Sequence, residues 1–486
     1  MRKLTLGKFL FVAAALVLAL SIVGCAKSDS GSAGTNNNDT TATPAPKATP
    51  TPEATPAKQE ETKTEPGAPA SNVPDLGGAT IKIGSWWDGM DPREVPEADR
   101  GPSEEMQVQL IEEVEKKYNV KLEFVKFGDY NAYVENLTTT ALAGEPFADI
   151  VALELFWSFP TLVNQGFLAP FDDQVDLSDP KEYTDWIRSA GKFQGKHYGY
   201  YDGTPSPFGL IYNKTLLQQL GLPDLYELQV SGEWTWEKFR QIMKDATKDT
   251  NGDGAIDIWG LTGGWDGLSR ITENFLYANN GAVTKEVNGQ LSFALDSPES
   301  IEALTFVSDL YNVDKTIKEL TEGSDPFGDF IAQKGVMVAG FNWNIGDLLN
   351  NMPDQELGYV FFPKAPNASD YTTFTPYGNM FFVVKQSKYA DIAMKIYDEI
   401  SLKSNLKELA YEGWKQGYPS MDMVETRSQM YDKVQYSGDY LAVPDGGTLF
   451  SQVIDDITKG KIAPATAVDK VKGQFEGKIA ELNASR

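Results

Sequence analysis

The stretch ADIVALELFW, residues 148–157, contains the run that decides the fold. After Asp149 the chain is continuously apolar from Ile150 to Leu153. A short unbroken apolar run of this kind is typical of a strand that is buried on both faces of a parallel sheet. The run therefore predicts a sheet that is covered by helices on both sides.

Strand-like and helix-like stretches alternate around this run. We expect strands where apolar residues alternate or cluster over 80–84, 120–124 and 149–153, and helices that open at Ser103, Thr235, Ser297 and Ser387. This alternation predicts an α/β architecture. Beyond the N-terminal region the chain has roughly 410 residues, more than one ordinary core holds, so at least two lobes are expected.

The N-terminus carries the features of an export signal. Positive charges precede an apolar run from Phe9 to Val23, which is too short to span a membrane comfortably. The sequence Ile-Val-Gly-Cys then ends at Cys25, the only cysteine of the chain, in the manner of a bacterial lipobox. We expect residues 1–24 to be a lipoprotein signal peptide and Cys25 to be lipidated, which would place the protein on the outer face of the cell membrane.

Composition defines the next segment and excludes some partners. Residues 25–78 are mostly Ser, Thr, Pro, Ala and Lys with few large apolar side chains, which predicts a disordered tether. The formal net charge of −26 at pH 7 argues against binding to nucleic acid or to an anionic bilayer surface.

The stretch DTNGDGAIDIWGL, residues 249–261, is spaced like a calcium-binding loop. Oxygen ligands at alternate positions around a glycine turn suit Ca²⁺. The expected ligands are Asp249, Asn251, Asp253, the Ala255 carbonyl and Asp257. Gly260 stands where a bidentate glutamate would complete the site, so a plain Asp/Asn/Gly turn without metal is the alternative.

Several motifs in a fixed order resemble one family. They are ADI at 148–150, NQGFLAPFDD at 164–173, GKHYGYYDG at 195–203, GLIYNKTLLQQLGLP at 209–223, EWTWEKF at 233–239 and IAQKGVMVAGFNW at 331–343. Together they resemble the extracellular solute-binding proteins (family 1) of carbohydrate ABC importers, the maltose-binding-protein-like group. The likeness runs from about residue 79 to the C-terminus.

The resemblance implies a two-lobe, type II periplasmic-binding-protein-like fold whose lobes are joined by a hinge of crossing strands. It places the N-terminal lobe at 79–204 and 378–436, and the C-terminal lobe at 205–377 and 437–486. It also implies that the protein captures an oligosaccharide and delivers it to the permease subunits of an ABC importer. We further expect a monomer without an organic cofactor, from a Gram-positive bacterium. In related binders a similar Asp/Asn-rich loop has a structural role, so any calcium here is expected to support the lobe.

The candidate ligand residues follow predicted strands or crossovers. Ligands of open α/β sheets bind outside the carboxyl ends of strands, and aromatic rings beside carboxylates and amides suit the C–H faces and hydroxyl rims of sugars. The candidates are Trp86, Trp87, Asp88, Glu154, Trp157, Asp202, Trp265, Asp266, Asn342, Trp343 and Tyr377.

Two other functions remain open from the residues alone. Asp88, Glu154 and Asp202 stand near aromatics and could be the paired carboxylates of a secreted glycoside hydrolase. A passive surface adhesin without a closed cleft is the third reading. His197 is the single histidine, which leaves few other catalytic arrangements. We expect a binding protein and no enzymatic activity.

Overall fold

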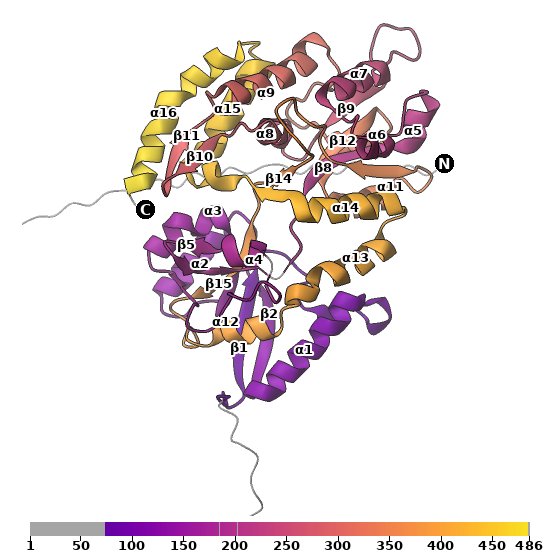
Figure 1. Cartoon of the computed structure of the whole chain (residues 1–486). Helices are drawn as coiled ribbons and strands as arrows, with labels where there is room; N and C mark the ends of the chain where they lie inside the picture. Colours follow the sequence, from indigo (N-terminus) through magenta and orange to yellow (C-terminus); the bar gives the residue numbers. More distant parts are fainter. Residues whose placement is uncertain (1–72, 184, 202, 485–486) are drawn as a thin grey trace, which may run out of the picture. The chain divides into compact units, whose positions relative to one another are not determined.

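The computed structural model describes residues 73–183, 185–201 and 203–484 of the chain (Figure 1). The predicted signal peptide, Cys25, most of the predicted tether and Asp202 lie outside the described residues. Within the described part, every helix is too short or too polar to cross a membrane.

A mixed sheet with the strand order β2-β1-β3-β15-β4 is the centre of the N-terminal lobe, and β7 pairs with β15. The strands are β1 (Ala79–Ser85), β2 (Val120–Lys126), β3 (Ile150–Glu154), β4 (Leu168–Ala169), β7 (Gly199–Tyr200) and β15 (Asn379–Val384), with a small hairpin of β5 (Lys192–Phe193) and β6 (Lys196–His197). The helices of this lobe are α1 (Pro102–Tyr118), α2 (Tyr133–Leu142), α3 (Leu155–Trp157), α4 (Asp185–Ser189) and α12 (Ala393–Glu399). All five residues of β3 are buried, which confirms the predicted buried strand.

The helix starts follow local chemistry. The helix expected at Ser103 begins one residue earlier, at Pro102, because proline has the backbone angle of a first helical residue and lacks an N–H that would go unpaired there. Thr235 and Ser297 cap their helices as predicted, each side chain accepting a backbone N–H three residues on. The helix expected from Ser387 starts only at Ala393.

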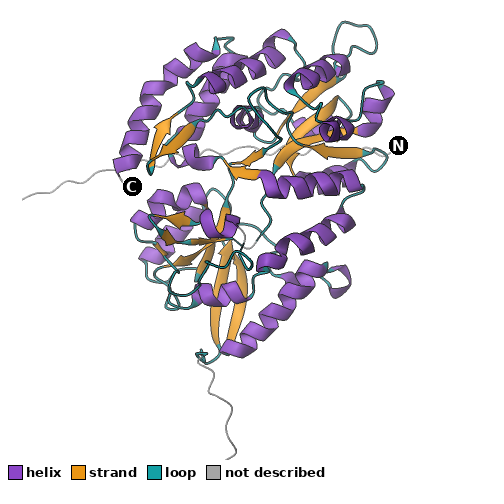
Figure 2. Ribbon diagram, in the orientation of Figure 1, coloured by secondary structure: helices purple, strands orange, loops and turns teal. Residues whose placement is uncertain are grey.

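The C-terminal lobe is built on a second sheet, with the order β13-β8-β12-β9. Its strands are β8 (Phe208–Asn213), β9 (Trp259–Gly264), β12 (Gly335–Phe341) and β13 (Leu357–Val360), and β10 (Thr284–Val287) and β11 (Gln290–Phe293) form a separate hairpin. Its helices are α5 (Lys214–Gln219), α6 (Leu225–Ser231), α7 (Trp236–Ala246), α8 (Ser269–Ala278), α9 (Pro298–Ser308), α10 (Pro326–Ile331), α11 (Asn344–Asn351), α15 (Gly446–Thr458) and α16 (Pro464–Ala484). Helices flank both sheets (Figure 2), as the α/β prediction requires.

Short elements complete the chain. β14 (Thr373–Thr375) and β16 (Val434–Tyr436) pair in parallel, and α13 (Leu406–Gly417) and α14 (Met421–Lys433) precede β16. The remaining single turns are η1 (Pro92–Glu94), η2 (Glu97–Asp99), η3 (Ser158–Leu162), η4 (Asp309–Val313), η5 (Lys403–Asn405) and η6 (Gly438–Ala442).

Hydrophobic packing draws the lobe border differently from the prediction. Residues 378–436 were expected in the N-terminal lobe, but Met423 and Met430 of α14 are fully buried in the core of the C-terminal lobe. α14 also packs on β13 of that lobe's sheet. By its core contacts α14 therefore belongs with the C-terminal lobe, because its methionines fill that lobe's apolar interior.

Strand direction brings the predicted site residues to two sheet edges. β1 and β3 run parallel and end at Ser85 and Glu154, and β15 starts at the same edge because Asn379 pairs with Glu154. In the other sheet β9 and β12 are also parallel, and end at Gly264 and Phe341. These are the edges at which ligands of α/β sheets bind.

Candidate functional site

Aromatic side chains gather at the carboxyl edge of the N-terminal sheet. Trp86, directly after β1, makes edge-to-face contacts with Trp157 and Tyr133 (both 5.2 Å between ring centroids) and with Tyr130 (5.5 Å). Trp87 lies 4.7 Å from Trp86. We call Trp86, Trp87, Tyr130 and Trp157 the N-terminal aromatic group. The structure thus brings together three tryptophans predicted from the sequence and adds Tyr130.

A hydroxyl holds the turn that presents these rings. The Ser85 hydroxyl donates to the Trp87 carbonyl at 2.7 Å and accepts from the Trp87 N–H at 3.2 Å. Ser85 itself is fully buried at the end of β1. The turn that carries Trp86 and Trp87 is therefore anchored to the sheet by a hydrogen-bonded residue.

The two acidic candidates of this lobe are placed differently. The Asp88 side chain is 79% exposed and forms an ion pair with Lys126 at the end of β2. Glu154 is only 2% exposed. Its carboxylate accepts a hydrogen bond from the Gly378 N–H at 3.0 Å, and burial raises its pKa to about 8. Glu154 therefore binds the backbone just before β15 and does not face open solvent.

A second set of rings follows β9 and β12 of the C-terminal sheet. Trp265 and Trp343 meet edge to face at 4.7 Å, and Trp343 stacks on Phe341 at 5.3 Å. Tyr377 lies 5.4 Å from Phe341. We call these four residues the C-terminal aromatic group. Trp265 is 38% exposed and Trp343 is 47% exposed, which is unusual for such large apolar side chains and leaves ring surface for a ligand.

A buried charged network stands beside the C-terminal aromatic group. Arg270 of α8 donates to Asp266 at 3.2 Å and to the Tyr440 hydroxyl at 3.0 Å, and it also pairs with buried Glu273. The Arg270 guanidinium lies 5.9 Å from the centre of the Tyr377 ring. The network holds Asp266 at the sheet edge while half of its side chain stays exposed.

Asn342 contributes a carbonyl oxygen to the same edge. This residue follows β12, and its backbone N–H donates to the Pro207 carbonyl at 3.3 Å. Its side-chain oxygen is buried and has no hydrogen-bond partner among the described residues. An acceptor without a partner at a sheet edge fits a binding role better than a purely structural one.

Tyr130 links the two aromatic groups. Burial raises the pKa of the Tyr130 hydroxyl, and the neighbouring charge of Glu154 and the hydroxyl of Tyr377 raise it further, whereas Arg270 lowers it. The tyrosine of one group therefore lies within electrostatic range of Tyr377 and Arg270 beside the other. Tyr130 and Tyr377, which lie far apart in the sequence, are therefore close enough in space to influence each other's ionisation.

Tyr130 and Arg270 were not predicted from the sequence. Tyr130 lies in the loop before α2, and Arg270 lies in the first turn of a helix. Neither residue comes directly after a strand, because Tyr130 is four residues past the end of β2 and Arg270 is six residues past the end of β9, so the rule that selected the tryptophans passed over both. The only signal for Arg270 was its spacing from Asp266, four residues before it, and from Glu273, three residues after it.

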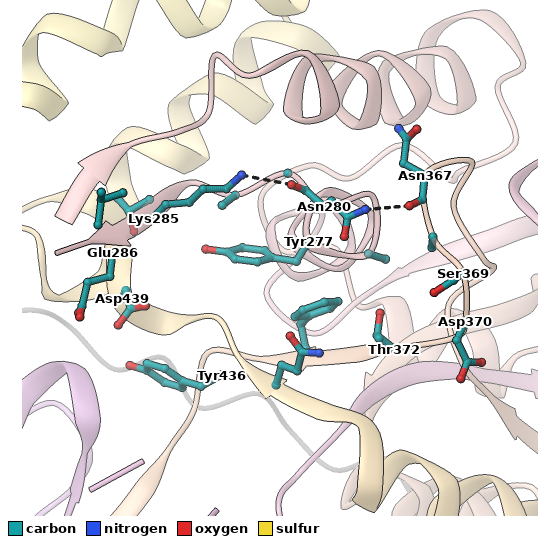
Figure 3. A pocket seen from close by; sticks show the side chains of 18 residues that line it. Tyr277, Asn280, Lys285, Glu286, Asn367, Ser369, Asp370, Thr372, Tyr436 and Asp439 are labelled. Atoms are coloured by element: carbon teal, nitrogen blue, oxygen red, sulfur yellow. Dashed lines mark hydrogen bonds between the residues drawn. The ribbon is translucent and has the colours of Figure 1, made fainter. Parts of the chain in front are cut away.

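Two cavities lie at the aromatic groups, and a third cavity contains none of their residues. One of about 370 Å³ at the N-terminal edge is lined by Trp87, Phe124, Tyr201, Asn379 and Phe381 among others. Another of about 280 Å³ is lined in part by Trp265 and Asp266. A polar cavity of about 540 Å³ (Figure 3) is lined by Tyr277, Asn280, Lys285, Asn367, Tyr436 and neighbours, and contains none of the predicted ligand residues.

The loop predicted to bind calcium connects α7 to β9. Its carboxylates accept hydrogen bonds from the loop itself: Asp249 from the N–H groups of Gly252 (2.7 Å) and Gly254 (2.8 Å), and Asp253 from the Ala255 N–H (2.8 Å). Asp257 accepts from the N–H and hydroxyl of Thr250. Among the described residues, no group of three Asp, Glu, His or Cys side chains is placed to hold a metal ion. Calcium binding by this loop stays a prediction.

Two α/β lobes with exposed aromatic rings at their sheet edges are typical of a solute-binding protein. Comparison with known protein families identifies the family. The model of the bacterial extracellular solute-binding protein family matches residues 102–401, more than half of the chain. The chain belongs to this family, which confirms the resemblance seen in the sequence.

Solved structures share the two-lobe fold. A cyclo/maltodextrin-binding protein complexed with maltotetraose is 20% identical, covers 84% of this chain and 98% of its own, and has a TM-score of 0.62. An ABC substrate-binding protein from Listeria monocytogenes in complex with cycloalternan is 17% identical over 83% and 99%, with a TM-score of 0.59. UgpB from Mycobacterium tuberculosis in complex with glycerophosphocholine is 17% identical over 83% and 100%, with a TM-score of 0.61.

Proposed function

We propose that this solute-binding protein captures an oligosaccharide at the two aromatic groups and delivers it to the permease of an ABC importer. The observation that carries the proposal is the exposed pair Trp265 and Trp343 at the carboxyl edge of its sheet. Flat rings beside Asp266 and the Asn342 carbonyl supply both the apolar face and the polar groups that a sugar needs. Two similar structures hold maltotetraose and cycloalternan, which supports the ligand class.

The ligand is a neutral or weakly acidic oligosaccharide. Glycerophosphocholine in another similar structure shows that the fold alone does not select sugars. Five tryptophans in two groups favour stacking on several sugar rings over binding of a single small phosphodiester. The acidic balance of the chain also disfavours polyanions.

A binding role explains the acidic residues better than glycoside hydrolysis. Hydrolysis requires two carboxyl groups that both reach the scissile bond. Asp88 is exposed and paired with Lys126, and Glu154 is buried against Gly378. Neither arrangement supplies an acid and a nucleophile facing one substrate.

An oligosaccharide panel tests the function. We expect a member of the panel to raise the melting temperature and to be recovered intact after prolonged incubation. Shortened sugars would establish the hydrolase alternative, and no response to any sugar would favour the adhesin. Glycerophosphocholine belongs in the panel, because a response to it alone would contradict the sugar assignment.

We further propose that the mature protein is anchored through a lipid on Cys25 at the outer face of the cell membrane, on a tether formed by residues 25–78. The support is the lipobox-like sequence after a short apolar run. Membership of an extracellular solute-binding protein family is consistent with this location. A tether of this composition would let the folded part reach both ligand and permease.

The loop at 249–257 is proposed to bind one calcium ion that stabilises the C-terminal lobe. The support is the spacing of Asp249, Asn251, Asp253 and Asp257. The loop is closed at its base by Lys248, whose N–H and carbonyl bond to Ile258 and Asp257. Chelation tests this role, as set out in the Discussion.

A further inference from the structure

The cavity of about 540 Å³ in Figure 3 combines aromatic rings with a polar rim. Its residues come from the end of α8, from β10, from the loop before β14, and from β14, β16 and η6. The rings of Tyr277 and Phe374 lie with their centroids 5.4 Å apart, and Phe374 is buried. The volume falls within the range of about 300 to 1,000 Å³ that is typical of small-molecule sites. The cavity shares no residue with either aromatic group.

Two hydroxyl groups that line the cavity lack a hydrogen-bond partner among the described residues. They belong to Thr284 and Tyr436. The Thr284 residue is only 3% exposed. Most buried hydroxyl groups in proteins have a partner, and an unpaired one costs free energy. A polar ligand in the cavity would supply the missing partners.

Hydrogen bonds hold the rim of the cavity in place. The Asn280 amide donates to the Asn367 carbonyl at 2.8 Å, and the Lys285 ammonium donates to the Asn280 carbonyl at 3.4 Å (Figure 3). The Asn367 amide in turn donates to the Asn279 side chain at 3.2 Å. These bonds join the end of α8 to β10 and to the loop before β14. The rim is therefore ordered before a ligand binds, which lowers the entropy cost of binding.

The charges at the rim favour a neutral ligand. One cation, Lys285, lines the cavity together with the carboxylates of Glu286, Asp370 and Asp439. Asp370 is paired with Lys433 at 2.7 Å. An anion would meet the carboxylates, and an organic cation would have Lys285 beside it. Neutral donors and acceptors for ligand hydroxyls come from Asn280, Asn367, Ser369, Thr372 and Gln435.

We propose that this cavity is a second solute site, which binds a single neutral sugar ring or cyclic polyol. The Tyr277 ring covers the C–H face of the ligand, and the Thr284 hydroxyl and the Asn280 amide bond to its hydroxyl groups. The second site does not depend on the proposed function, because none of its residues belongs to the sugar site proposed above.

Threonine-methyl NMR of the full chain tests the second site with glucose, galactose, mannose, xylose and myo-inositol as probes. The signals missing in Thr284→Val and Thr272→Val identify the two methyl groups. Thr272 is the matched control, because its hydroxyl is also buried without a partner among the described residues, yet it does not line the cavity. We expect at least one probe to shift the Thr284 methyl and not the Thr272 methyl. A dissociation constant of about 1 to 10 mM is expected for a single sugar ring.

The affinity of the variants shows whether the polar groups make the contacts. It is read from the methyl of Thr372, which also lines the cavity and is identified by Thr372→Ser. Binding should be about 3- to 10-fold weaker in Thr284→Val, because one hydrogen bond is lost, and unchanged in Thr272→Val. Asn280→Gly should weaken binding similarly, and it carries the test should Thr284→Val fail to fold. Glycine is chosen there because the φ of Asn280 is 64°, in the left-handed region.

Trp343→Ala separates the second site from the aromatic groups. The Thr284 methyl should respond to the probe in this variant as it does in the wild type. A response that is lost in Trp343→Ala would show that Thr284 only senses ligand bound at the aromatic groups, and would overturn the second site. A Thr284 methyl that no probe shifts, or equal affinity in the wild type, Thr284→Val and Asn280→Gly, overturns it as well. If no oligosaccharide of the panel binds, the proposed function fails, while the Thr284 response still decides whether the second site exists.

Discussion

Replacing Trp343 with alanine tests the sugar site through its most exposed ring. The side chain is 47% exposed and rests on Phe341 and Trp265. Because a tryptophan has about 250 Å² of surface, roughly 100 Å² is open to a ligand. A sugar that covers half to all of this area gains about 1.3 to 2.5 kcal/mol at about 25 cal/mol per Å². The alanine variant should therefore bind about 10- to 70-fold more weakly.

Titration calorimetry with the sugar that responds in the panel measures this loss. Trp343→Phe should retain part of the stacking surface and fall between the wild type and Trp343→Ala. Val230→Ala, a change at a 63% exposed apolar side chain on α6, is the matched control and should bind like the wild type. Wild-type affinity in both Trp343→Ala and Trp265→Ala would refute the stacking argument and remove these rings from the site.

The remaining predictions concern the anchor, the loop and stability. Cys25→Ser should release the protein from the membrane fraction; retention through a lipid on another residue would contradict the proposed anchor. A calcium chelator should lower the melting temperature of the wild type but not of Asp253→Ala, since calcium at 100 times its Kd would add about 2.7 kcal/mol; a wild-type curve indifferent to chelator and calcium would exclude the site. The raised pKa of Glu154 means that the folded state keeps a proton that the unfolded chain releases above its usual pKa of 4.5. This stabilisation is complete below pH 4.5 and is lost as the pH rises to about 8. In urea titrations the free energy of unfolding of the wild type should therefore fall by about 2 to 4 kcal/mol more than that of Glu154→Gln over this window. The same pH dependence of unfolding free energy in both proteins would count against a protonated Glu154. Thr235→Ala should cost about 1 kcal/mol because it removes the cap of α7, with Thr235→Ser as control; an unchanged urea midpoint would show that the cap contributes nothing.

Patterns with a short range predicted much of this molecule. The apolar run before Glu154 identified a buried strand, and the strand ends located Trp86, Trp157, Trp265 and Trp343, because the backbone direction of a parallel sheet fixes where its loops emerge. The family motifs added the two-lobe arrangement. These features depend on local spacing, which a sequence displays directly.

The partners of individual side chains depend on long-range pairing instead. Glu154 resembles a ligand residue in the sequence, yet it binds the backbone of Gly378, 224 positions away. Nothing near Glu154 indicates that pairing. The place of Met423 and Met430 in the C-terminal core depends in the same way on which lobe α14 contacts. Sequence spacing could not decide either case.

The proposed site places the choice of ligand at the sheet edges. Two of the strands that end there, β3 and β12, are buried along their whole length, and their side chains pack in the cores. Just beyond the strands, Trp265 and Trp343 keep exposed surface; the two rings contact each other, and Trp343 also stacks on Phe341. We expect changes at these positions to alter which solute is bound and to disturb the cores little, because Trp265 and Trp343 are 38% and 47% exposed and only part of each ring packs on the protein. A variant such as Trp343→Ala should accordingly change affinity far more than it changes the melting temperature, and the ratio of the two effects separates a ligand-binding ring from a structural one.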